Sequence, residues 1–235
     1  MPSKLKQLLD FCTKQVIFLS NIRCLLCGDT KFGSNLCPEC KNRLMSVVIL
    51  GCHRCGLPLF QQLERCGRCL PTWYVSKTYF LGDYDWPFKG WITGLKYHHR
   101  LPYGRLMGEW LAEKLRQEGI MVDCLIPMPL HVSRLRSRGF NQASEIAKIL
   151  SKSLDIPIAW DVATRIRATS TQTKLTAQAR RANLKQAFQV QPLQGQTVAI
   201  VDDVLTTGAT SQALAQALLK AGAKDVQLWC LARVL

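Results

Sequence analysis

The chain has 235 residues, of which 48% are hydrophobic and 20% are charged, and these proportions are typical of a globular protein with a sizeable core. Lys and Arg number 31 against 16 Asp and Glu, so the net charge is +15 and favours attraction to polyanions such as nucleic acid, anionic membranes or phosphorylated small molecules. Uninterrupted apolar stretches stay well short of the roughly 18 residues that a membrane-spanning helix needs, which excludes such a span.

The first twenty residues contain Lys4, Asp10 and Lys14 in a mixed stretch, which argues against the apolar core of a signal peptide. Apolar residues between positions 5 and 19 recur at helical spacing and predict a short amphipathic helix that packs on the segment after it. We therefore expect a cytoplasmic protein.

The eleven cysteines of a chain expected to be cytoplasmic indicate metal binding rather than disulfides. Eight of them form four Cys-x-x-Cys pairs: Cys24 and Cys27, Cys37 and Cys40, Cys52 and Cys55, Cys66 and Cys69. Each such turn points two thiolates at one point and two turns complete a tetrahedral site, so the sequence predicts two structural Zn2+ sites. Sequential pairing is the simplest arrangement, and a cross-braced pairing stays open. A redox motif is the alternative for a single pair.

After Pro71 the density of cysteines falls and strands begin to alternate with helices. Apolar runs predict strands over 78–81, 123–128, 197–201 and 226–234, and helical spacing predicts helices over 87–97, 106–117, 141–153, 176–187 and 210–220. This alternation indicates an α/β domain with a parallel sheet and helices on both faces. We expect that domain over residues 73–235, preceded by a zinc module over residues 1–72.

The predicted strand over 197–201 leads directly into two adjacent carboxylates, Asp202 and Asp203, and then into a Thr/Gly loop that opens a helix. The carboxyl edge of an open parallel sheet is where ligands bind. Free N–H groups at the start of a helix, with threonine hydroxyls and a glycine, suit a phosphate monoester. The neighbouring carboxylates accept hydrogen bonds from ribose hydroxyls and can hold Mg2+ through water.

This run resembles the fingerprint of the type I phosphoribosyltransferases: an apolar strand, two acids, three variable residues and Thr-Gly-x-Thr. The resemblance implies that family's fold and a ligand of the phosphoribosyl pyrophosphate (PRPP) type. It also implies that Asp202 and Asp203 bind the ribose hydroxyls. The 5-phosphate would be cradled by a loop made of Thr206, Thr207, Gly208, Ala209 and Thr210.

The middle of the chain is strongly basic. Between Leu130 and Lys185, eleven Lys and Arg residues oppose three acids, a net charge of +8. One polar cluster follows the predicted strand over 123–128 and comprises Arg134, Arg136, Arg138, Asn141 and Gln142. A second is long and polar enough for a flap and comprises Arg165, Arg167, Gln172, Lys174, Arg180, Arg181 and Asn183. Because guanidinium groups suit pyrophosphate oxygens, we expect the first cluster to face the two aspartates across a crevice.

The order of these motifs resembles the competence protein F family over essentially the whole chain. The resemblance is carried by the four cysteine pairs, by Leu95-Lys96-Tyr97-His98-His99-Arg100, by Pro127-Met128-Pro129-Leu130, by Arg138-Gly139-Phe140-Asn141-Gln142 and by the PRPP fingerprint. It implies a cytosolic protein needed for natural transformation that acts on single-stranded DNA as the DNA enters the cell.

The first functional hypothesis is therefore a DNA-uptake factor. Single-stranded DNA would follow a groove formed by Lys96, Arg100, Arg134, Arg136, Arg138 and the basic flap, with Tyr97 and Phe140 as stacking platforms. The PRPP-type loop would hold a terminal 5-phosphate, or PRPP as a regulatory ligand.

Two further hypotheses stay open. One is an Mg2+-dependent phosphoribosyltransferase that acts on a base or an amine, in which Mg2+ and arginines stabilise the departing pyrophosphate. The other, compatible with DNA binding, is a zinc-ribbon adaptor that docks on a DNA-translocation helicase or a recombination-loading protein.

Overall fold

The computed structural model describes residues 23–30, 35–45, 50–67, 69, 73–167 and 187–234. The chain divides into two compact units, an N-terminal unit of Met1–Val48 and a C-terminal unit of Ile49–Leu235. The predicted helix over 5–19, and all but the last residue of the one over 176–187, lie outside the described residues. The first four cysteines of the zinc pattern belong to the N-terminal unit, and the second four share a unit with the sheet.

The N-terminal unit contains helix α2 (Pro38–Met45), which carries Cys40 in its first turn. A backbone hydrogen bond of 2.8 Å from Gly28 N to Cys24 O closes the turn of the first cysteine pair. Gly28 takes a positive φ of 79° there, a conformation that glycine adopts without strain.

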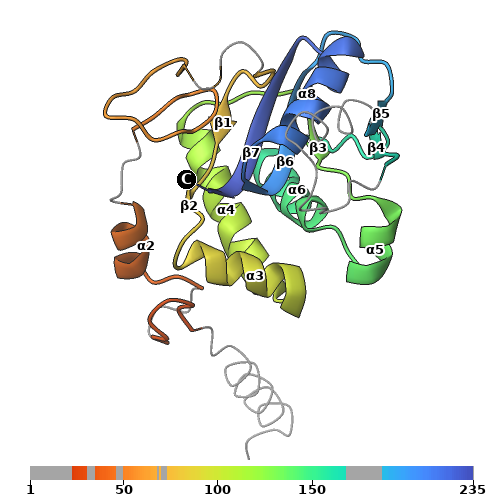
Figure 1. Ribbon diagram of the computed structural model, residues 1–235. Helices are drawn as coiled ribbons and strands as arrows, with labels where there is room; N and C mark the ends of the chain where they lie inside the picture. Colours follow the sequence, from red (N-terminus) through yellow and green to blue (C-terminus); the bar gives the residue numbers. More distant parts are fainter. Residues whose placement is uncertain are drawn as a thin grey trace, which may run out of the picture. The chain divides into compact units, whose positions relative to one another are not determined.

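A five-stranded parallel sheet forms the centre of the C-terminal unit (Figure 1). Its strands are β1 (Thr78–Tyr79), β2 (Gly82–Asp83), β3 (Cys124–Pro127), β6 (Thr197–Leu205) and β7 (Asp225–Arg233). The order is β1-β7-β6-β3, β2 also pairs with β7, and every pairing is parallel. The central strands β6 and β7 are buried along most of their length, which explains their nearly continuous apolar sequence.

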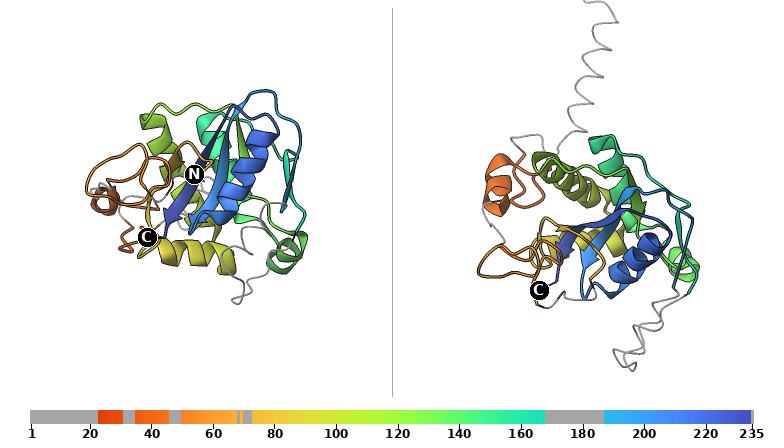
Figure 2. Two further views of the ribbon diagram at one scale, coloured as in Figure 1. Left: turned by 45° about the horizontal axis from the view of Figure 1, so that its top comes forward. Right: turned by 90° about the horizontal axis from the view of Figure 1, so that it is seen from above.

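Helices cover both faces of this sheet. Helices α4 (Leu101–Gln117) and α6 (Gln142–Leu154) pack on each other and on one face, and α8 (Ala209–Lys220) lies on the opposite face, as the views in Figure 2 show. Helix α3 (Phe88–His98) packs against α4. The predicted α/β class, with a parallel sheet and helices on both faces, is confirmed. In the described part of the chain, none of the helices combines the length and apolarity that crossing a membrane requires.

Five elements were missed by the sequence patterns, among them helix α2 and the two-residue strand β2. Helix α5 (Val132–Arg138) has no buried residue and therefore no apolar periodicity. Strands β4 (Ala163–Arg165) and β5 (Phe188–Val190) form a separate antiparallel pair of three residues each, too short for an alternating pattern to stand out.

Two predicted boundaries were wrong. The strand expected to end at Val201 continues to Leu205, because β7 goes on pairing with it beyond Asp202 and Asp203. Helix α4 begins at Leu101, five residues earlier than expected, since its proline falls in the first turn, where no N–H is needed.

The turn between α8 and β7 provides a test of the fold. Gly222 has a φ of 105°, and a Cβ at this position would clash with the backbone oxygen of Leu193. We expect Gly222→Ala to lower the free energy of unfolding by about 2–3 kcal/mol, because backbone strain and overpacking add. Gly119→Ala is the matched control: its φ is 62° and the space around it is open. Equal losses in urea denaturation would contradict the clash.

Candidate functional site

The candidate site lies where β6 stops pairing with β3. The ladder between β3 and β6 ends at the pair Pro127 and Val201, whereas the ladder between β6 and β7 continues to the end of β6. Among the described strands, β6 is therefore paired on one side only from Asp202 onward. This open side is at the carboxyl edge of the sheet, where ligands bind in open α/β folds. The two aspartates lie inside the strand at this point, not beyond its end.

The second aspartate is paired with a lysine from α3. Lys96 Nζ lies 3.0 Å from Asp203 Oδ2, and both side chains are largely buried. The sequence suggested Lys96 as a contact for pyrophosphate or DNA, but in the structure its ammonium group is held by a carboxylate. A ribose hydroxyl that approached Asp203 would meet an oxygen already bound to Lys96.

The first aspartate has an unusual acidity. Burial raises the pKa of Asp202 and the negative charge of Asp203 raises it further. The Asp203 N–H, which donates to Asp202 Oδ1 at 2.9 Å, and the cations Lys96 and Arg165 lower it, and the resulting pKa is about 7. A carboxyl group that titrates near neutrality can change its charge when a ligand or Mg2+ arrives.

The loop after β6 presents polar groups at the start of α8. Thr206 and Thr207 are exposed, and Gly208 takes a φ of 77° immediately before α8 begins at Ala209. Thr207 Oγ1 accepts a long hydrogen bond of 3.4 Å from Ala209 N, and Gly208, the N-cap residue of α8, provides no side-chain cap. The remaining N–H groups of the first turn point along the helix axis toward the open end.

Arginines from two other segments lie around the same edge. Arg165 on β4 is buried, and its guanidinium carbon lies 5.6 Å from the centre of the Phe188 ring. Burial lowers the pKa of Arg165, the charge of Arg134 on α5 lowers it further, and the charge of Asp202 raises it. Arg165 therefore interacts electrostatically with both groups.

Helix α5 meets the end of α3. The guanidinium carbon of Arg138 lies 5.4 Å from the centre of the Tyr97 ring, and Tyr97 follows Lys96 in α3. The rings of His99 and Phe140 are 4.9 Å apart. Arg138 is thus connected through Tyr97 and Lys96 to Asp203, so the basic cluster and the carboxylates lie at one edge of the sheet.

Two residues predicted to contact a ligand, Asn141 and Gln142, instead form hydrogen bonds within the protein. Asn141 Oδ1 accepts a hydrogen bond of 3.1 Å from Ala143 N at the start of α6, and Asn141 Nδ2 donates to Met128 O at 3.0 Å. Gln142 is buried and its Oε1 accepts a hydrogen bond of 2.9 Å from Arg138. Both side chains hold the loop after β3 and orient Arg138.

The other predicted contacts are less closely grouped. Arg136 is exposed on α5. Arg100 Nη1 donates to Tyr103 Oη at 3.2 Å and lines a cavity of about 550 Å3 that also includes Trp86, Lys89 and His98. Five residues of the second predicted cluster lie outside the described residues: Gln172, Lys174, Arg180, Arg181 and Asn183. Sequence reasoning missed a cavity of about 370 Å3 between Pro127, Phe140, Trp160 and Arg165.

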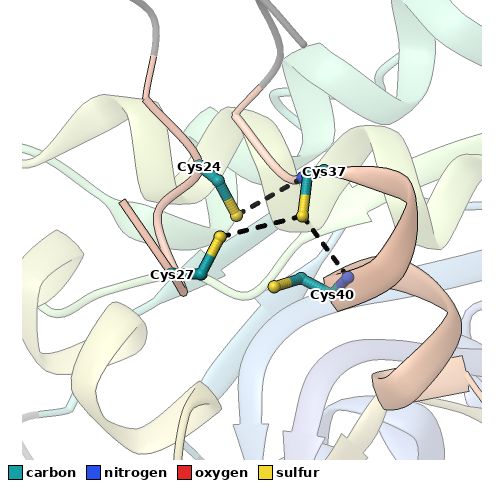
Figure 3. A group of neighbouring side chains, drawn as sticks. All are labelled: Cys24, Cys27, Cys37 and Cys40. Carbon is teal, nitrogen blue, oxygen red and sulfur yellow. Dashed lines mark hydrogen bonds between the residues drawn. The ribbon is translucent and has the colours of Figure 1, made fainter. Parts of the chain in front are cut away.

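The eight paired cysteines form two groups, each with its thiol sulfurs within 4.8 Å of one another. The first group comprises Cys24, Cys27, Cys37 and Cys40, and Figure 3 shows the four side chains pointing toward one another. The second comprises Cys52, Cys55, Cys66 and Cys69. The pairing is therefore sequential, which settles the alternative that the sequence left open.

Both groups fit Zn2+. Four thiolates are the donor set of structural zinc, and backbone N–H groups point at the sulfurs, as from Cys66 N to Cys52 Sγ at 3.2 Å. Burial raises the pKa of Cys24, but hydrogen bonds, among them those from the backbone of Cys27 and Cys37, outweigh it and lower that pKa to about 6. In the same group, burial and the neighbouring thiols raise the pKa of Cys40. An ionised thiol is the form that binds a metal.

Comparisons with known proteins agree with this picture. The family model of the phosphoribosyl transferase domain matches residues 136–235, and that of the double zinc ribbon domain matches residues 15–70. The chain is 37% identical over 211 residues to the DNA utilization protein YhgH of Salmonella typhimurium, covering 85% of this chain and 91% of that protein. It is 34% identical over 227 residues to competence protein F of Haemophilus influenzae, covering 91% and 97%. The chain belongs to the competence protein F family.

Membership of the competence protein F family confirms the resemblance inferred from the order of the motifs, and the two domain matches confirm the phosphoribosyltransferase-like fold with an N-terminal double zinc ribbon. Among solved structures, a purine phosphoribosyltransferase from Pyrococcus horikoshii is 25% identical, with a TM-score of 0.34 over 56% of this chain and 73% of that one.

The acidity of Asp202 predicts a pH dependence of stability. Its folded-state pKa of about 7 exceeds the ordinary value of 3.8, so between these values the folded protein binds a proton that the unfolded chain releases. Stability should therefore fall as the pH rises toward 7, by at most about 1.4 kcal/mol per pH unit.

Asp202→Asn removes this titration. In urea denaturation we therefore expect the free energy of unfolding of the variant, relative to that of the wild type, to rise with pH up to about 7. The comparison runs from about pH 5.5 to about pH 8, because cysteine metal sites release their metal in acid. Asp161→Asn, at an exposed position, is the control. Parallel curves for wild type and Asp202→Asn would contradict the raised pKa.

Proposed function

We propose that this protein acts in the uptake and use of DNA by binding single-stranded DNA along a basic rim next to a PRPP pocket. We define the basic rim as Arg134, Arg136 and Arg138 of α5 together with Arg165 of β4. The names of its relatives, DNA utilization protein YhgH and competence protein F, support a role in DNA uptake.

The observation that carries the proposal is the proximity of the rim to the carboxylates. The guanidinium carbon of Arg138 lies 5.4 Å from the centre of the ring of Tyr97, and the preceding residue, Lys96, pairs with Asp203 at 3.0 Å. The charges of Arg134 and Asp202 also shift the pKa of Arg165 in opposite directions. A strand whose terminal phosphate occupied the loop after β6 would therefore meet the rim with its next phosphates. Contacts to phosphates provide affinity without reading sequence.

Aromatic groups near the rim suit the bases. Tyr97 is 64% exposed beneath the guanidinium group of Arg138, and Phe140 packs beside His99. Stacking of a base on such a ring contributes about 1–3 kcal/mol and tolerates every base. The combination of cations and rings fits a single strand better than a duplex, whose bases are already stacked.

The pocket itself would take PRPP or a terminal ribose 5-phosphate. The loop Thr206–Thr210 would hold the 5-phosphate through backbone N–H groups and hydroxyls, and Asp202 would accept hydrogen bonds from the ribose hydroxyls. Asp203 would do so once Lys96 moves toward the pyrophosphate. Mg2+, when bound, would neutralise the pyrophosphate and join it to the carboxylates.

A transferase activity is the second candidate, and the cavity of about 370 Å3 favours it. This cavity lies beside Arg165 and the loop after β3, and it is lined by Phe140 and Trp160 as well as by polar groups. A flat base that entered it would have aromatic and polar partners. Release of pyrophosphate from PRPP in the presence of a base or amine would establish the activity, and its absence would leave PRPP as a ligand.

The basic rim can be tested with paired substitutions. We expect Arg134→Ala with Arg138→Ala to weaken binding of single-stranded DNA about tenfold at fixed salt, and to lower the slope of log K against log salt by about 1.4, the contribution of two single-strand phosphate contacts. Fluorescence anisotropy with a labelled oligonucleotide measures both quantities.

The control is Lys220→Ala with Lys224→Ala, which removes the same charge at the far end of α8. If the two double variants lose affinity equally, only the net charge matters and the rim is not the binding surface.

The PRPP pocket has its own test. At a ligand concentration about 100 times its Kd, Mg-PRPP should stabilise the wild type by about 2.7 kcal/mol, which thermal unfolding detects. Asp202→Asn with Asp203→Asn should abolish this protection, because the amides bind the ribose hydroxyls and Mg2+ poorly. Asp155→Asn with Asp161→Asn, both exposed, should keep it. A wild type that Mg-PRPP leaves unprotected would refute the pocket.

A further inference from the structure

The side chain of Trp73 contacts both the second group of cysteines and the loop Thr206–Thr210, which we call the phosphate loop after its proposed ligand. The indole packs against the buried cluster made by Cys52, Cys55, Cys66 and Cys69. The same indole packs against the main core of the C-terminal unit. A side chain that belongs to two clusters transmits a displacement from one to the other, since packed interiors deform little.

On the cysteine side, Trp73 is held by a reciprocal pair of hydrogen bonds. Trp73 Nε1 donates to Arg54 O at 2.9 Å, and Arg54 Nη1 donates to Trp73 O at 3.3 Å. Arg54 lies between Cys52 and Cys55, inside the turn that supplies two of the four thiols. The conformation of that turn therefore sets the position of the indole.

On the other side, the indole lies against the backbone of Gly208 in the phosphate loop. A Cβ built on Gly208 would clash with Trp73 Cη2 and would lie 2.9 Å from Trp73 Cζ3. The residue after Trp73 is tied to the helix that follows the loop: Tyr74 N donates to Gln212 Oε1, and Gln216 Nε2 donates to Tyr74 Oη at 2.7 Å. The loop and the first two turns of α8 thus rest on residues 73 and 74.

Apart from its thiols, the cysteine turn is held by a small number of hydrogen bonds, among them that from Thr78 N of β1 to His53 O at 2.9 Å. Within the described part of residues 50–69, the only strand-like contacts are single bridges, from Gly51 to Pro58 and from Cys52 to Leu63. In such a segment the metal supplies much of the folding free energy. Loss of the metal would release the turn that holds Trp73, and with it the backing of Gly208.

We propose that metal bound by Cys52, Cys55, Cys66 and Cys69 positions the phosphate loop through Trp73, so that occupancy of this site sets the affinity of the loop for a phosphate. Trp73 is a positioning residue, which touches the loop rather than the ligand. The proposal concerns the second cysteine group alone, because the first belongs to the other unit. The effect on affinity rests on the proposed PRPP pocket, whereas the effect on the loop does not.

The experiment uses the full-length, zinc-loaded protein and makes two separate measurements: the order of the loop without ligand, and the affinity for the ligand. Hydrogen exchange of the amides of residues 205–212 reports the order of the loop, and calorimetry with Mg-PRPP reports affinity. We expect Cys52→Ser with Cys55→Ser to speed the exchange about tenfold or more and to weaken binding by a similar factor, because a loose loop must be ordered on binding. Cys24→Ser with Cys27→Ser should change neither quantity by more than about twofold, the usual scatter of independent sites.

A second pair of variants isolates the tryptophan from the metal ligands. Trp73→Ala should reproduce the effects of the second cysteine pair, and Trp86→Ala, which removes a 72% exposed tryptophan, should have no effect on the loop. Zinc content is measured in each variant. Loss of zinc from Trp73→Ala would report the same coupling in the reverse direction, since linkage is reciprocal.

The coupling is overturned if loop exchange in Trp73→Ala is no faster than in Trp86→Ala, or if both cysteine pairs affect the loop equally. Should the second cysteine pair unfold the unit, the comparison of the two tryptophan variants decides. A wild type that fails to bind Mg-PRPP defeats the proposed pocket alone, because the exchange measurement still decides whether the metal site orders the loop.

Discussion

The candidate site depends on the cost of two adjacent carboxylates in a buried strand. Asp202 and Asp203 repel each other and lose hydration. Two features reduce this unfavourable energy: Lys96 pairs with Asp203, and Asp202 has a pKa raised to about 7. Arg165 is also buried, which disfavours its charged form, and it interacts electrostatically with Asp202. Such an arrangement is unfavourable for stability alone, which is the usual mark of groups retained for binding.

The same electrostatics links the pocket to the basic rim. In the proposed pocket, Lys96, which pairs with Asp203 in the free protein, would become available to a phosphate once the carboxylate bound a ribose hydroxyl or Mg2+. Lys96, Tyr97 and Arg138 form a continuous path from the carboxylate to α5. A ligand in the pocket would therefore redistribute positive charge along the surface proposed for DNA.

The two cysteine groups look equivalent in the sequence but differ in the structure. The first belongs to the N-terminal unit, whereas the second shares a core residue, Trp73, with the phosphate loop. The spacing of the cysteines predicted both metal sites because each Cys-x-x-Cys turn is local. It carried no sign of the contact between Trp73 and Gly208, on which the proposed difference between the two metal sites rests.

The sequence by itself determined the elements whose cause is local: the cysteine turns, the long helices with a regular apolar face, and the strand that leads into the twin aspartates and the threonine-glycine loop. Only the tertiary structure decided which charges meet. The ion pair of Lys96 with Asp203 joins residues 107 positions apart, and α5 and the short strands β4 and β5 lack an apolar pattern to reveal them. Periodicity records burial along one segment, whereas partners distant in the chain are chosen by the packing of the whole fold.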